Sequence, residues 1–149
     1  MFIFSEIWLN EDVCSSAAQG GHLNLLQWFR QLGSSWNKYT CSSAARGGHL
    51  ELLKWARANG CPWDYSTCSN AAKGGHLEIL KWARDNGCPW DHNTCAYAAE
   101  NGHFEVLKWA RDNGGTWDTH TFRYKKSFAS SNLLGVLQGM EILKFWNGF

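Results

Sequence analysis

Apolar and polar residues follow one another along this chain in a pattern that repeats every 27 residues. Eleven of the 27 positions carry the same residue in all four copies, and no gap is needed to align them. A fixed period of this kind indicates stacked structural repeats, each of which buries its apolar face against its neighbours. The predicted repeats are residues 14–40, 41–67, 68–94 and 95–121.

The two ends of the chain depart from this pattern. The first 13 residues include the large apolar side chains Phe4, Ile7, Trp8 and Leu9. We interpret residues 1–13 as an N-terminal cap and residues 122–149 as a divergent C-terminal capping unit, because a terminal repeat has a neighbour on one side only. The chain is therefore expected to form a single repeat domain over residues 1–149.

Each unit is expected to form two helices, as the second unit illustrates. Thr40 is a candidate N-cap for a first helix over residues 41–46, which two consecutive glycines would end. A second helix is predicted over residues 49–59, with Gly60 as its left-handed cap. Its apolar residues cover a wide arc, which is typical of a helix with neighbours on both sides. The pattern therefore predicts an all-α fold, a helical solenoid.

The segment joining these two helices has a recognisable order. Residues 44–54 read AARGGHLELLK, and Gly60 and Trp63 follow. This order resembles the second half of an ankyrin repeat, and the resemblance recurs in register over residues 14–121. The resemblance implies a stack of helix pairs with a concave, variable face that binds a partner protein.

Two features distinguish these units from a standard ankyrin repeat. The period is 27 residues where the family has about 33, and the missing residues fall between Asp64 and Cys68, where the family places a β-hairpin. We therefore expect shortened or absent β-hairpins. The units are similar to tryptophan-rich short repeats of giant viruses and protists, whose second helix and turn read LKWARxNGCPWD.

Overall charge narrows the classes of partner. The chain has 14 basic and 13 acidic residues, a net charge of +1, whereas binders of nucleic acid or anionic membranes usually carry a basic surplus. No window approaches the roughly 18 apolar residues of a membrane span, and the N-terminus does not read as a secretory signal. We therefore expect an intracellular, cytoplasmic monomer (in the host cytoplasm if the protein is viral) that binds neither nucleic acid nor membrane.

Histidine and cysteine recur at fixed positions, which raises the question of a metal or redox site. Successive repeats lie about 10 Å apart, whereas zinc ligands lie within about 2.3 Å of one ion. Equivalent side chains therefore cannot share a metal. The histidines are expected to donate hydrogen bonds at the start of each second helix, and the cysteines to fill small core positions. We expect no metal and no cofactor.

Eight of the ten tryptophans form two ladders. One ladder lies on the second helices and the other in the turns that follow them: Trp28, Trp55, Trp82 and Trp109, then Trp36, Trp63, Trp90 and Trp117. Because these positions never vary, we favour packing between repeats. The alternative is stacking of single-stranded nucleic-acid bases on exposed rings.

Positions that vary between units are not required for stacking, and they gather around the start of the first helix. The pairs at 38–39, 65–66, 92–93 and 119–120 are expected just before that helix, and those at 15–16, 42–43, 69–70 and 96–97 within it. The candidate partner-binding residues are Lys38, Tyr39, Ser43, Arg46, Tyr65, Ser66, Asn70, Lys73, His92, Asn93, Tyr97, Glu100 and His120. Neutral drift on a solvated surface would also produce variability, but the clustering of tyrosine and histidine favours recognition.

No nucleophile, base and orienting residue form a recognisable catalytic motif, so an enzyme is not expected. The predicted function is a non-catalytic protein–protein interaction scaffold. The alternatives are a structural spacer and a binder of single-stranded nucleic acid.

Overall fold

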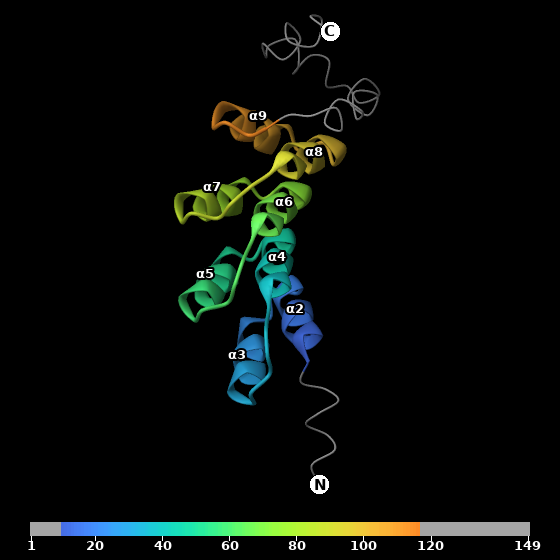
Figure 1. The fold of residues 1–149 in the computed structure, drawn as a ribbon. Helices are drawn as coiled ribbons and strands as arrows, with labels where there is room; N and C mark the ends of the chain where they lie inside the picture. Colours follow the sequence, from blue (N-terminus) through green and yellow to red (C-terminus); the bar gives the residue numbers. More distant parts are fainter. Residues whose placement is uncertain (1–9, 117–149) are drawn as a thin grey trace, which may run out of the picture.

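The computed structural model describes residues 10–116, and within them the chain forms eight α-helices and no strand. The helices come in pairs, one pair for each repeat (Figure 1). The first helices of the pairs are α2 (Glu11–Gln19), α4 (Lys38–Gly47), α6 (Tyr65–Gly74) and α8 (His92–Glu100). The second helices are α3 (Leu23–Gln31), α5 (Leu50–Ala58), α7 (Leu77–Asp85) and α9 (Phe104–Asp112). The predicted all-α repeat fold is confirmed for this part of the chain.

Some sequence predictions fall outside the described residues. These are the capping unit at 122–149, the first nine residues of the predicted N-terminal cap, and the candidate site residue His120. The last residues assigned to that cap, 11–13, form the start of α2.

The first helices begin three residues earlier than the sequence predicts. The N-cap of α4 is Asn37, whose side-chain Oδ1 accepts a hydrogen bond from the Tyr39 amide at 2.9 Å. Asp64 and Asp91 cap α6 and α8 in the same way. The prediction of Thr40 as N-cap was wrong, because Asn and Asp at the end of the turn cap a helix at least as well as Thr. Thr40 instead lies inside α4, where it is buried.

Glycine ends both kinds of helix, as predicted. Gly48 follows α4 with a φ of 85°, and Gly60 follows α5 with a φ of 83°. Residues with a side chain rarely adopt this left-handed conformation, so glycine is needed at both turns. The predicted second helix is found two residues shorter, as Leu50–Ala58.

The helix pairs stack so that the first helices lie side by side in one row, while the second helices splay apart in another (Figure 1). The more closely packed row of first helices forms the inner side of the curved stack. Small residues permit this close approach, since Cys41, Ala44 and Ala45 of α4 are fully buried. The largest buried residues on the second helices are four equivalent leucines, Leu26, Leu53, Leu80 and Leu107.

Candidate functional site

Each first helix presents one exposed stripe along its length. On α4 the stripe is Tyr39, Ser43 and Arg46, which are spaced i, i+4 and i+7 and therefore share one side of the helix. The equivalent stripes on α6 and α8 are Ser66, Asn70, Lys73, Asn93, Tyr97 and Glu100, all at least partly exposed. With the residues at the three helix starts, Lys38, Tyr65 and His92, they make up what we call the inner face. The structure thus brings together twelve of the thirteen candidate residues.

Two details of the predicted site were wrong. The pairs that begin with Lys38, Tyr65 and His92 lie in the first turn of each helix, because the N-cap is the residue before them. In addition, three variable positions point into the stack and are buried: Ser42, Ser69 and Ala96. The Ser42 hydroxyl donates to the backbone oxygen of Tyr39 at 3.2 Å, so burial leaves it satisfied.

Tyrosine rings supply the apolar part of the inner face. Tyr39 is 56% exposed and Tyr65 is 48% exposed. The other large apolar side chains exposed among the described residues all belong to α3 or the residue after it, at the N-terminal end of the stack: Leu25, Trp28 and Leu32. Exposed tyrosines are the kind of side chain that contributes most to the free energy of binding at protein interfaces.

Lysines lie beside two of these rings. The Lys38 Nζ lies 5.6 Å from the ring centroid of Tyr39, within one helix. The Lys73 Nζ of α6 lies 5.0 Å from the ring centroid of Tyr97 on α8, so this contact joins two repeats. At exposed sites such cation–π contacts contribute about 0.5–1 kcal/mol each, which orients the rings without locking them.

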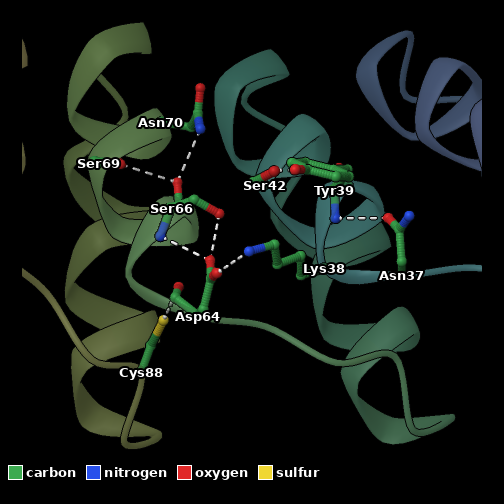
Figure 2. A network of polar contacts seen from close by, with 9 residues as sticks. All are labelled: Asn37, Lys38, Tyr39, Ser42, Asp64, Ser66, Ser69, Asn70 and Cys88. Atoms are coloured by element: carbon green, nitrogen blue, oxygen red, sulfur yellow. Dashed lines mark hydrogen bonds and ion pairs between the residues drawn. The ribbon is translucent and has the colours of Figure 1, made fainter.

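One ion pair ties two repeats together on the inner face (Figure 2). The Lys38 Nζ lies 2.8 Å from Oδ2 of Asp64, which also caps α6 by accepting from the Ser66 amide at 2.9 Å. Burial raises the pKa of the Asp64 carboxyl, but the hydrogen bonds from Lys38 and Ser66 together outweigh burial and hold that pKa below its ordinary value. The hydrogen bond to Asp64 raises the pKa of Lys38. Both groups are therefore charged at neutral pH.

Charge changes sign along the inner face. The last turns of α4 and α6 carry Arg46 and Lys73, whereas α8 carries Glu100 at the same position. The second helices show the opposite behaviour, because an identical ion pair recurs there. Lys54 lies 2.8 Å from Glu51 on α5, and the same pair on α7 is 3.0 Å apart. The same ion pair is thus repeated on the second helices, which we call the outer row, whereas the sign of the charge differs between repeats on the inner face.

The repeated histidines link neighbouring repeats. The Nε2 of His76 lies 3.0 Å from the backbone oxygen of Arg46 in the repeat before it, and His49 and His103 make the same contact. Because a carbonyl oxygen only accepts, this nitrogen carries the proton and donates. The ring also lies against the glycines that end the first helices, so that a Cβ at Gly74 would come within 2.5 Å of it. The predicted structural role of these histidines is confirmed.

All six cysteine side chains are buried, and none forms a disulfide. The structure pairs thiols that the sequence analysis did not connect: Cys41 lies with Cys61, and Cys68 lies with Cys88. The hydrogen bond with Cys61, together with burial, raises the pKa of Cys41. The hydrogen bond with Cys88, together with burial, raises the pKa of Cys68 in the same way. These two thiols are therefore protonated at neutral pH and poorly nucleophilic.

The second cysteine of each pair has a role that the sequence could have shown. The Sγ of Cys61 donates to the backbone oxygen of Asn37, the N-cap of α4, at 3.5 Å. Ser34 stands at the equivalent position of the first repeat, and its hydroxyl donates to the backbone oxygen of Asn10 at 3.3 Å. Serine or cysteine at this position in the first three repeats supplies a hydrogen-bond donor that fastens the turn to the helix start. Gly115, at the same position of the fourth repeat, has no such side chain.

Six of the described tryptophans pack between repeats, as favoured by the sequence, whereas Trp28 is exposed. Each of the three described turn tryptophans contacts the helix tryptophan of the next repeat edge to face. The ring centroids are 5.8, 5.7 and 6.0 Å apart in the pairs Trp36–Trp55, Trp63–Trp82 and Trp90–Trp109. An arginine covers the face of each turn ring, as Arg57 does at 4.1 Å from the Trp63 centroid. These six rings are half-buried rather than fully buried, so the ladder lines the outside of the core.

A metal site and a membrane span are both absent from the described residues. Residues 10–116 hold no group of three or more histidine, cysteine or acidic side chains arranged to bind a metal ion. Within the same part of the chain, no helix has the length and apolar character needed to cross a membrane.

Comparison with protein families agrees with the geometry. Residues 41–84 and 68–111 match the family model described as ankyrin repeats (many copies). Each match begins at a cysteine that opens a unit, so residues 41–111 are similar to ankyrin repeats, in agreement with the stacked helix pairs. Ankyrin repeats generally act as protein-interaction modules and are typically non-catalytic. The comparison with curated proteins gave no match.

Proposed function

We propose that this protein is a non-catalytic scaffold whose inner face binds a partner protein. The observation that supports this proposal most directly is a division of roles along each repeat. The histidines and tryptophans that join repeats recur from repeat to repeat among the described residues. The exposed stripes of α4, α6 and α8 instead differ from one another in size, charge and hydrogen-bonding groups. A surface that is not needed for stacking and carries different chemistry in each repeat suits recognition of one particular partner.

The chemistry of the inner face suits a protein ligand. Tyr39 and Tyr65 offer exposed rings, and Arg46, Lys73 and Glu100 offer charges around them. Aromatic side chains supply most of the free energy of binding in such interfaces, while charges at the rim tune association rate and salt dependence. We place this binding in the cytoplasm, where buried thiols stay reduced, and we expect the chain to act as a monomer.

The alternative of binding single-stranded nucleic acid is less well supported. Base stacking needs open ring faces, but Arg30, Arg57 and Arg84 cover the faces of the three turn tryptophans at 4.1–4.3 Å. A structural spacer would need no variation between the exposed stripes. The inner face is therefore the surface to test.

A pair of matched variants tests the proposal on a partner recovered by affinity capture from the protein's own cell. Replacing Tyr65 and Tyr97 by alanine should weaken binding by roughly thirtyfold or more, since a single good interface anchor contributes about 2 kcal/mol. The melting temperature should change little, because neither ring is part of the repeated core. Replacing Lys54 and Lys81 on the outer row should leave the affinity unchanged. Loss of binding in the lysine variant alone would place the partner on the other side.

A further inference from the structure

The N-terminal end of the stack exposes a face that every later repeat buries. Leu25 on α3 is 39% exposed, whereas the equivalent residues of the next three repeats, Leu52, Ile79 and Val106, are at most 3% exposed. The difference lies in their neighbours, because each later residue has a preceding repeat packed against it among the described residues. The face around Leu25 therefore has the shape and chemistry of a surface made for such a contact.

Trp28, on the same helix, is also more exposed than the equivalent residues of the later repeats. It is 53% exposed, while Trp55, Trp82 and Trp109 each contact a turn tryptophan of the repeat before them. A turn side chain in the equivalent place for Trp28 would have to come from one period earlier than Trp36, that is, from residue 9.

The residues of α3 make this face more apolar than its later counterparts. Phe29 stands where the other repeats have a buried alanine, and Leu32 stands where they have asparagine. Asn24 and Gln27 replace the glutamate and lysine that pair on α5 and α7. A repeat that ends a stack in water is expected to become more polar on its outer face. These four changes make α3 less polar or less charged than the later second helices, which indicates that the face is covered.

The chain carries a segment of matching chemistry directly beside it. A hollow of about 480 Å³ lies against α3, and its lining includes Val13, Leu25, Phe29 and Asn10, the first described residue. The nine residues that precede Asn10 read MFIFSEIWL, of which seven are apolar. By the 27-residue period they are in register with residues 28–36, the end of a second helix and its turn.

We propose that residues 1–9 dock on the exposed face of α3 and stand in for a preceding repeat, with Trp8 and Leu9 against Trp28. The segment is joined to the face through Asn10, so its effective concentration there is on the order of millimolar, far above that of a second molecule in dilute solution. In this arrangement the segment shields the apolar end of the stack and leaves the inner face as the surface open to a partner.

The first test measures the exposure of Trp28 in the full chain. Fluorine NMR of protein labelled with 5-fluorotryptophan gives one signal for each ring, and Trp28→Phe identifies the signal of Trp28. We expect that signal to respond weakly to exchange of H₂O for D₂O, and to respond as an exposed ring does in Trp8→Ala. Ser5→Ala, in the same segment, should leave it unchanged. A Trp28 signal that is already solvent-exposed in the unmodified chain would overturn the proposal.

The second test distinguishes the chain's own segment from a second copy. The full-length variant with Ser5→Cys and Asn24→Cys, which keeps the apolar residues of both the segment and the face, is oxidised with copper–phenanthroline in dilute solution. The control carries Ser5→Cys and Pro62→Cys, whose second thiol is on an exposed turn. We expect a cross-link within one molecule that forms at least about tenfold faster than in the control. Cross-linked dimers would show that a second copy covers the face, and the absence of any preferred cross-link would show that residues 1–9 lie elsewhere. Either result contradicts the proposal.

Discussion

At the scale of single residues, glycine and histidine meet at each described junction between repeats. The glycine that follows a first helix faces the histidine ring of the next repeat, as Gly75 faces His103. The same histidine donates to a backbone oxygen of the earlier repeat, in this case that of Lys73 at 3.1 Å. One close contact and one hydrogen bond thus fix how each repeat sits on its neighbour.

Two glycines with the same backbone conformation allow this contact to be measured. Gly75 and Gly87 have φ values of 77° and 79°, but a Cβ at Gly75 would come within 2.6 Å of the His103 ring, whereas a Cβ at Gly87 would meet nothing within 4 Å. Alanine at either position should cost about 1–2 kcal/mol for the left-handed backbone. Gly75→Ala should cost roughly 1–3 kcal/mol more for overpacking. Urea unfolding measures both, and equal losses would contradict the close contact.

The thiols give a second prediction at this scale. All six cysteines are buried, which keeps a reagent away from their sulfur atoms. This holds for Cys41 and Cys68, whose pKa is raised by hydrogen bonding and burial, and for Cys61 and Cys88, whose pKa is lowered by the hydrogen bond with the paired thiol. A thiol reagent at neutral pH should therefore react slowly with the native protein and with six thiols once the protein is unfolded without reductant. Fewer than six reactive thiols in the unfolded chain would reveal a disulfide and contradict the structure.

At the scale of helices, features set by neighbouring residues in the sequence could be predicted, whereas features set by packing between distant residues could not. Two glycines between apolar runs locate the break after α4, because only glycine adopts the backbone required there. The helix start was misplaced because Thr40 and Asn37 are both acceptable caps, and the choice depends on how the turn packs. The pairing of Cys41 with Cys61 was missed for a related reason. It depends on the turn after α5 folding back on α4, the first helix of the same repeat.

The cap of α6 should also make stability depend on pH. The pKa of Asp64 is depressed in the folded state, so its contribution to stability is present above the unfolded pKa of about 3.9 and is lost as pH falls through the folded value. Asp64→Asn keeps an oxygen for the Ser66 amide, as Asn37 provides in α4, and removes the titration. The free energy of unfolding should fall less below about pH 4 in this variant than in the parent. Parallel acid limbs in urea titrations would show that Asp64 is not involved.

At the scale of the whole molecule, a residue pattern repeated four times along the sequence forms the stack, and the residues that differ between repeats make its exposed surface different in each repeat. The fold could be predicted because each repeated position supplies the same evidence four times. The candidate inner-face residues could be chosen because variation marks positions not needed for stacking. Of the variable pairs within the first helix, the candidate list named the members that are at least partly exposed, Ser43, Asn70 and Tyr97. The pairs expected before the helix were misplaced, because that placement depends on which acceptable cap starts the helix.

Coupling between repeats is measurable through one tryptophan pair. The rings of Trp63 and Trp82 belong to successive repeats, and their centroids lie 5.7 Å apart. Replacing each by alanine, singly and together, should give a coupling free energy of about 0.5–1.5 kcal/mol in a double-mutant cycle. A coupling near zero in urea unfolding would mean that the two rings do not hold the repeats together.

The most direct test of the account is a map of amide hydrogen exchange with and without the partner recovered by affinity capture. We expect the partner to slow exchange in the first helices, residues 38–47, 65–74 and 92–100, because their exposed stripes make up the inner face. Exchange in the second helices, residues 50–58 and 77–85, should remain as it is in the protein alone. Protection confined to the second helices would contradict the assignment of the inner face as the binding surface.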